Sequence, residues 1–145
     1  MKLAGRRSSS FSLTNGTRQG SVLSPMLFSV YLDDLLGELR SLQLGCHIGG
    51  VWYGACGYAD DLVLLATNRE VLQKMVSVCE RYGRDHNLVF STDPVPSKSK
   101  TKCMFLCGRT TNVKYPATVQ LDGKDLPWVE QADHPGHSLH RKLNM

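Results

Sequence analysis

One stretch decides the fold: Gly57-Tyr58-Ala59-Asp60-Asp61-Leu62-Val63-Leu64-Leu65-Ala66. Its last five residues predict a buried strand, and a strand also precedes it, so the two adjacent carboxylates fall at a tight turn between strands. Such a turn keeps charges out of the core yet fixes them in place. That arrangement suits a divalent cation, because hard cations such as Mg²⁺ prefer oxygen ligands. Adjacent aspartates are also common without any function, so the turn alone leaves both interpretations open.

A second aspartate pair, Asp33-Asp34, provides a comparison within the same chain. The apolar residues around it recur at helical spacing, at positions 27, 28, 31, 32, 35, 36 and 39. The two aspartates then share the opposite face largely with Gly37, Glu38 and Arg40. This pattern predicts that the second pair lies on the solvated surface of a helix.

The bulk composition indicates one modest globular domain. The chain has 145 residues, 41% of them hydrophobic and 21% charged. No apolar run approaches the roughly 20 residues that a membrane helix needs. The basic segment 1–7 is not followed by the apolar region of a secretory signal, although its Arg/Ser-rich, acid-poor composition has a weak similarity to transit peptides. We expect an intracellular protein, in the nucleus or the cytoplasm, that is not secreted.

The cysteines indicate reduced thiols. Their number is odd and their spacing irregular: Cys46, Cys56, Cys79, Cys103 and Cys107. Two of these are four residues apart in a predicted strand, and His134, His137 and His140 recur at every third position. A structural zinc site from these residues is a minor alternative, since neither set has a Cys-x-x-Cys spacing.

Positive charge is concentrated at the N-terminal end. No acidic residue occurs before Asp33, whereas Lys2, Arg6, Arg7 and Arg18 are basic. Basic and acidic residues are equal in number over the rest of the chain, so the whole net charge of +4 arises in this segment. A polyanion such as nucleic acid fits this distribution, and an ordinary soluble terminus with a few arginines fits it too.

The order of the expected elements predicts an α+β fold. Residues 6–20 are expected to be extended and to lead into a loop, and Ser24-Pro25 predicts a helix start, with Ser24 as its N-cap, for a helix to about 42. Strands follow within 46–66 with a bend at 49–50, then a helix from the cap Asn68 to about 87 and a loop over 92–100. A strand is expected at 102–107, then a hairpin of 113–121 with 124–129 across Asp122-Gly123. No period is evident from 132 to 145.

This order suggests one antiparallel sheet with helices on one face, similar to a split βαβ, ferredoxin-like layout. The first strand of that layout is missing or lies before Met1.

The segment Asn15-Gly16-Thr17-Arg18-Gln19-Gly20-Ser21-Val22-Leu23-Ser24-Pro25 is the second unusual stretch. A cation, an amide and a glycine stand in a loop just before a helix start. Glycine lets a backbone approach a ligand closely, and both arginine and a helix N-terminus favour phosphate. A plain loop with a capped helix is the alternative.

Together, residues 18–25 and Tyr58-Ala59-Asp60-Asp61 resemble the reverse transcriptase family, most closely its non-LTR retrotransposon type. The first segment is similar to motif B (about 15–25) and the second to motif C (about 57–66). Ser97 to Phe105, with Lys100-Thr101, is similar to motif D (about 87–105). The segment 132–140 resembles the primer grip, although Pro135 departs from that pattern. The resemblance implies a single partial reverse transcriptase domain over 1–145, with the fold of a partial polymerase palm.

The resemblance also implies roles for individual residues. Asp60 and Asp61 would be the catalytic metal ligands for Mg²⁺ in a two-metal site, and Lys100 would act on the leaving pyrophosphate, unless it is only a solvated loop lysine. The implied nucleotide- and template-binding residues are Arg18, Gln19, Gly20 and Tyr58. The implied partners are an RNA template, a DNA primer and a deoxynucleotide, with no membrane.

The family's further aspartate comes from motif A, on a strand before motif B, where this chain has no acidic residue. We therefore expect a polymerase fragment without motif A, the fingers and most or all of the thumb, which binds metal weakly and does not polymerise alone. The alternatives are a non-catalytic nucleic-acid-binding module on the same scaffold and an unrelated α+β protein with chance motifs. Group II intron and telomerase-like relatives stay open within the family.

Overall fold

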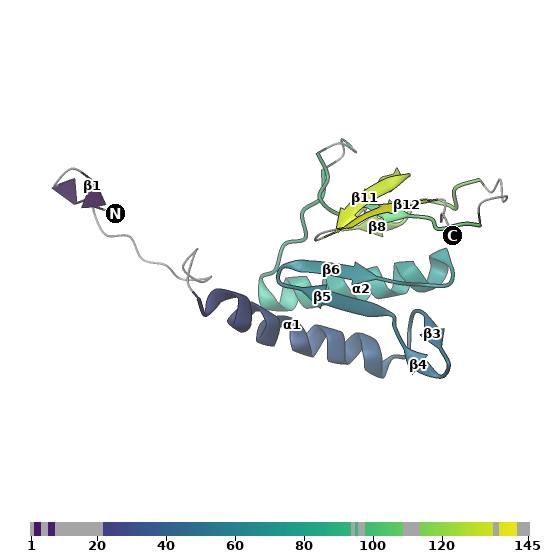
Figure 1. Ribbon diagram of the computed structural model, residues 1–145, viewed down its shortest axis with the longest axis horizontal. Helices are drawn as coiled ribbons and strands as arrows, with labels where there is room; N and C mark the ends of the chain where they lie inside the picture. The colour runs from purple at the N-terminus through teal and green to yellow at the C-terminus, as the bar shows by residue number, and fades with distance from the viewer. Residues whose placement is uncertain are drawn as a thin grey trace.

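The computed structural model describes residues 2–3, 6–7, 22–93, 95, 98–108, 114–134 and 137–141. Side chains are described within these ranges from residue 22 onward, except at 134 and 137. Two helices of 18 residues, α1 (Ser24–Ser41) and α2 (Arg69–His86), are the longest elements. Figure 1 shows the β5–β6 hairpin (Ala55–Tyr58 and Asp61–Leu64) crossing in front of α2, with α1 beside it.

The described strands form six two-stranded ladders. Five ladders are antiparallel: β1 (Lys2–Leu3) with β2 (Arg6–Arg7), β3 (His47–Ile48) with β4 (Val51–Trp52), β5 with β6, β8 (Gln120–Leu121) with β9 (Lys124–Asp125), and β11 (Gln131–His134) with β12 (His137–His140). The sixth pairs β10 (Trp128–Val129) with β7 (Cys103–Met104) in parallel. The mixed α+β class is confirmed. The prediction of a single antiparallel sheet is wrong for the described strands. Most of these strands have only two residues, so each offers few backbone groups to a further strand.

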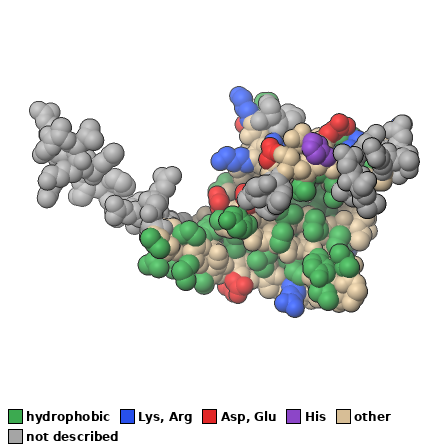
Figure 2. All heavy atoms as spheres, in the orientation of Figure 1, with side chains coloured by type: hydrophobic (Ala, Val, Ile, Leu, Met, Phe, Trp, Pro, Cys, Tyr) green, Lys and Arg blue, Asp and Glu red, His purple; other side chains and the backbone are tan. Residues whose placement is uncertain are grey.

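Helix α1 begins at Ser24, which is its first helical residue and not the N-cap that we expected; Leu23 occupies that position. Pro25 lies in the first turn, where its missing N–H costs nothing. Leu32, Leu35 and Leu39 are buried, whereas Asp33 and Asp34 are exposed, so the predicted solvated face is confirmed. Figure 2 shows hydrophobic side chains over the first turns of α1, where Val22, Met26 and Val30 are exposed.

Helix α2 begins and ends as the sequence predicts. The Asn68 side chain accepts a hydrogen bond of 2.9 Å from the backbone N–H of Val71, which is a standard N-cap. Asn87 ends the helix in the left-handed conformation with a φ of 55°. The buried face contains Met75, Val76, Val78, Cys79, Tyr82 and Gly83.

Two groups of buried side chains form the core. The first joins the buried leucines of α1 to Met75, Cys79 and Tyr82 of α2, and half-buried residues of β5 and β6 pack against it. The second joins Val76 to Cys103, Val119, Leu121 and Leu126. Helix α2 contributes to both groups, so it connects the β5–β6 hairpin to the C-terminal strands.

Four further expectations need correction. The strand predicted at 102–107 is only β7, and the strand after Lys124 stops at Asp125, because Trp128 pairs with Cys103 instead. The β11–β12 hairpin was not predicted, since residues 131–140 lack alternating apolar residues. The strand after Asp61 is half-buried and not buried, because the helices cover one of its faces. The Asp122-Gly123 turn is confirmed, with positive φ at both residues.

Candidate active site

The aspartate pair lies at a two-residue turn between β5 and β6. Tyr58 pairs with Asp61, so Ala59 and Asp60 make the connection. Ala59 has a φ of 52°, a left-handed conformation that residues with a Cβ rarely adopt. Backbone strain of this kind persists where the surrounding structure enforces it, often at functional sites. The hairpin therefore holds both carboxylates at a strained and closely defined turn.

The two faces of the hairpin differ in their surroundings. A Cβ on Gly57 would lie 3.6 Å from Cδ1 of Leu36, so this face of β5 points toward α1. Leu62 and Leu64 lie opposite Gly57 and Ala55 on the same face and pack against the core. Because side chains alternate along a strand, the side chains of Asp61 and of its partner Tyr58 point to the opposite, outer face of the hairpin. The outer face of the hairpin is therefore open beside the turn.

Both carboxylates face water. Asp60 and Asp61 are exposed, and Tyr58 is 65% exposed. In the part of the chain that the structure describes, neither aspartate has a side-chain hydrogen bond or an ion pair. Two negative groups on adjacent residues repel each other, and no described cation lies within ion-pair distance of them. An added cation would relieve this repulsion directly.

The two aspartate carboxylates supply part of the ligands that one hard cation needs. Mg²⁺ commonly takes one or two protein carboxylates and keeps several waters, so an exposed pair of aspartates is a suitable anchor. Among the described residues there is no group of three or more His, Cys, Asp or Glu side chains that could hold a metal ion. The turn therefore supplies part of a metal site, and a two-metal site needs further oxygen ligands.

The other expected site residues divide into two groups. Lys100 is exposed in the segment between α2 and β7 and forms no ion pair with either aspartate. Tyr58 lies beside the aspartates because it pairs in register with Asp61. Arg18, Gln19 and Gly20 lie outside the described residues. The structure thus brings Tyr58, Asp60 and Asp61 together, whereas no described ion pair joins Lys100 to either aspartate.

The alternative zinc site has no support in the described part of the chain. Cys103 and Cys107 are both buried, and burial raises the pKa of the Cys103 thiol to about 11, which disfavours the thiolate that binds metal. The thiol of Cys107 lies 4.0 Å from the backbone oxygen of Arg141. His140 is exposed, and the side chains of His134 and His137 lie outside the description.

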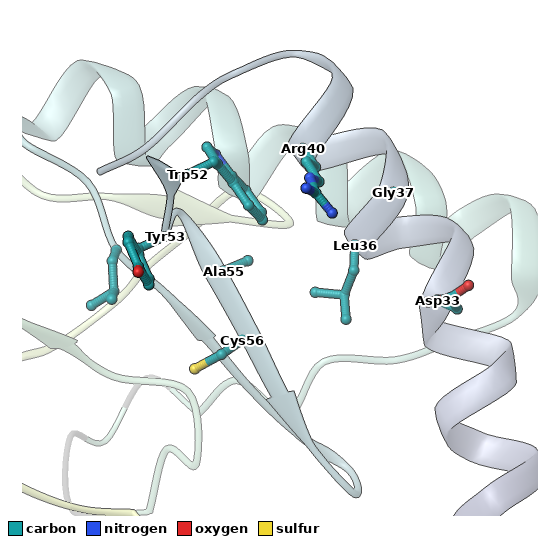
Figure 3. Close-up of a pocket in the computed structure, with 9 residues that line it drawn as sticks. Asp33, Leu36, Gly37, Arg40, Trp52, Tyr53, Ala55 and Cys56 are labelled. Carbon is teal, nitrogen blue, oxygen red and sulfur yellow. The ribbon is translucent and has the colours of Figure 1, made fainter. Parts of the chain in front are cut away.

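A groove beside the hairpin was not predicted from the sequence. It has a volume of about 450 Å³ and runs between α1 and β4–β5 (Figure 3). Asp33 and Arg40 line it from the helix, and Trp52 of β4 and the following Tyr53 line it from the opposite side. The aromatic pair at 52–53 was the available signal, but its meaning depends on how α1 packs against β5, which the sequence pattern does not specify.

Comparisons with known proteins identify the family of this chain. The family model described as reverse transcriptase (RNA-dependent DNA polymerase) matches residues 2–125. The chain is 36% identical over 99 residues to the Pol polyprotein of an R2 retrotransposable element from Nasonia vitripennis, covering 68% of this chain and 9% of that protein. It is 40% identical over 72 residues to the Drosophila melanogaster R2DM Pol polyprotein, covering 50% of this chain and 7% of that protein.

A putative 115 kDa protein of the Drosophila melanogaster element R1DM is 31% identical over 130 residues, covering 86% of this chain. The chain spans about a tenth of the length of these relatives. The matched residues include the aspartate turn, both helices and the β8–β9 hairpin. The chain belongs to the reverse transcriptase family, whose members are RNA-directed DNA polymerases, and is homologous to Pol polyproteins of R2 retrotransposable elements and to a protein of the element R1DM.

Proposed function

We propose that this chain is the part of a non-LTR retrotransposon reverse transcriptase that carries the Asp60-Asp61 metal-binding turn. One observation carries the proposal: a strained two-residue turn presents two adjacent carboxylates to water without a described counter-charge. Membership of the reverse transcriptase family supports this role for the turn. On this proposal α1, β5–β6 and α2 belong to a polymerase palm, and segments 15–25, 57–66, 87–105 and 132–140 are motifs B, C, D and the primer grip.

Each residue then has a defined task. Asp60 and Asp61 would hold Mg²⁺, which when bound supplies charge neutralisation for phosphoryl transfer. The open outer face of the hairpin would admit the primer end beside the turn. Tyr58, on that face, would bound the nucleotide site together with Arg18, Gln19 and Gly20. Lys100 would interact with the leaving pyrophosphate by moving toward the turn, since no described contact holds it there.

We further propose that the isolated chain does not polymerise. Two-metal chemistry needs more carboxylate oxygen than the turn provides, and among the described residues no third His, Cys, Asp or Glu joins the two aspartates in a metal-binding group. The basic N-terminal segment would still favour binding to a nucleic acid backbone. The specific alternative is a non-catalytic nucleic-acid-binding module that retains this scaffold.

A primer-extension assay on the purified chain tests this account. We expect no incorporation of deoxynucleotide on an RNA template with Mg²⁺ or Mn²⁺, and binding to a primer–template duplex that weakens steeply with salt. Metal-dependent extension that disappears in Asp60→Asn would show that the chain is active by itself. Absence of both extension and nucleic acid binding would contradict the proposed role and the alternative together.

A further inference from the structure

The outer edge of β5 has no strand partner in the described part of the chain. β5 pairs with β6 alone. The backbone N–H of Leu65 donates to the oxygen of Gly54, so this pair, one step beyond the last residues in register, is hydrogen-bonded. Antiparallel ladders alternate, which means that Cys56 and Tyr58 bond to β6 whereas Ala55 and Gly57 direct their N–H and C=O groups outward. β5 therefore presents an open row of donors and acceptors.

The groove in Figure 3 follows this edge. Ala55 and Cys56 both line it although their side chains point to opposite faces of β5, so the strand edge itself forms the floor. Helix α1 makes one wall with Leu36 and Gly37, and the first three residues of β5, Ala55 to Gly57, carry no bulky or charged side chain. Proteins commonly protect such edges with lysine, proline or a bulge, and β5 has none of these between Ala55 and Tyr58.

Two opposite charges mark the ends of the groove. Asp33 and Arg40 are seven residues apart on α1, which places them on the same side of the helix and about 10 Å apart along its axis. Both are exposed, and neither side chain has an ion-pair partner among the described residues. The groove is therefore negative at one end and positive at the other.

We propose that this edge and groove form an interface between two copies of the chain, in which β5 pairs antiparallel with β5 of a second copy. A two-fold axis through Cys56 places Ala55 opposite Gly57 of the second copy, so the outward groups of both strands bond to each other. The same axis reverses the helix direction, which brings Arg40 of each copy toward Asp33 of the other. The edge, the groove and both charges are thereby satisfied by one self-complementary contact.

The resulting sheet has four strands in the order β6, β5, β5 and β6. Strand addition proceeds in the plane of the sheet, so the outer face of each hairpin and its aspartate turn stay open. A second copy fits better than an unrelated extended peptide, because its reversed α1 places Arg40 opposite Asp33 and Asp33 opposite Arg40.

Analytical ultracentrifugation of the full chain, from low to high micromolar concentration, tests the interface. We expect a monomer–dimer equilibrium in the wild type. Arg40→Glu and Asp33→Arg should each weaken the dimer by at least about tenfold, because each places like charges together twice per interface. The double variant Asp33→Arg/Arg40→Asp restores the opposite charges and should restore the dimer.

Asp34→Arg is the matched control, since Asp34 is an exposed neighbour that does not line the groove. It should leave the dimer unchanged, and circular dichroism should show the same helical content in all variants. A monomeric wild type would overturn the proposal. So would single charge reversals without effect, or larger assemblies that are insensitive to them, because association would then use another surface.

Discussion

Ala59 fixes the direction in which the two aspartates point. Its φ of 52° is required because Tyr58 and Asp61 pair directly, which leaves two residues to reverse the chain. The same residue was unremarkable in the sequence, where alanine gives no turn signal. The sequence predicted the position of the turn from its flanking apolar residues, but the strain at this residue depends on the register of the ladder.

Substitution at Ala59 should change stability according to the cost of a positive φ. Ala59→Val is expected to lower the free energy of unfolding by about 1–2 kcal/mol, because a β-branched residue is strongly disfavoured there. Ala59→Gly should leave it unchanged or raise it by up to about 1 kcal/mol, because glycine adopts this conformation freely but is more flexible when unfolded. Urea unfolding measures both values. Ala117→Val, at an exposed residue without positive φ, is the control, and an equal loss there would show that the turn is not strained.

The buried thiols should make stability depend on pH in the alkaline range. Burial raises the pKa of Cys79 from its ordinary value of 9.0 to about 12 and that of Cys103 to about 11. A thiol with a raised pKa stabilises the fold fully below pH 9, and this contribution is lost as the pH rises through the folded-state pKa. The free energy of unfolding should therefore fall above pH 9 by up to about 1.4 kcal/mol per pH unit for each thiol.

Unfolding of the wild type and of Cys79→Ala/Cys103→Ala between pH 8 and about 10.5 isolates this effect, because the loss begins above the ordinary thiol pKa of 9.0 and continues toward the folded-state values of about 11 and 12. The double variant should be less stable at pH 8 but should lose less stability as the pH rises. Equal slopes in the two proteins would contradict the buried environment. Exposed Cys56 should react with a thiol reagent in the native state, well before Cys79 and Cys103 do.

At the scale of elements, α2 organises the molecule through one apolar and one polar face. Its apolar face was predictable because the buried residues follow the helical period. Its polar face was not, because the side chains bond to the backbone of a segment some 47 positions away. Arg69 donates to the oxygen of Thr118, and Gln73 bonds to both the N–H and the C=O of Gln120. The Gln73 side chain thus makes the hydrogen bonds that a neighbouring strand would otherwise make. These bonds explain how the short β8–β9 hairpin stays in position against α2.

Gln73→Ala should release the β8–β9 hairpin from α2. Two hydrogen bonds of 2.9 and 2.8 Å are lost at an exposed position, so the free energy of unfolding should fall by about 1 kcal/mol. The amide of Gln120 should exchange with solvent faster, since it donates to the Gln73 side chain. Lys74→Ala is the control on the same helix, at an exposed residue. Unchanged exchange at Gln120 in Gln73→Ala would show that this contact does not hold the hairpin.

At the scale of the whole molecule, local patterns predicted the helices and turns but not how the strands join. Ser24-Pro25, Asn68 and Asp122-Gly123 mark their elements through local backbone chemistry, and each lies within a residue of its predicted place. The parallel contact of β7 with β10 and the β11–β12 hairpin rest on long-range packing, which a single sequence does not encode as a period. Of the helices that the structure describes, Ser24–Ser41 and Arg69–His86, neither combines the length and the apolar character needed to cross a membrane.

The central claim is that the Asp60-Asp61 turn binds a divalent metal whereas the Asp33-Asp34 pair does not. Each pair consists of two adjacent and exposed aspartates, but only Asp60-Asp61 is fixed at a strained hairpin turn. Paramagnetic broadening of backbone NMR signals during a Mn²⁺ titration measures this directly. We predict broadening centred on residues 58–62, with an affinity on the order of millimolar because only two carboxylates bind. It should be lost in Asp60→Asn/Asp61→Asn and kept in Asp33→Asn/Asp34→Asn. Broadening centred on Asp33, or unchanged after the substitutions at the turn, would contradict the account.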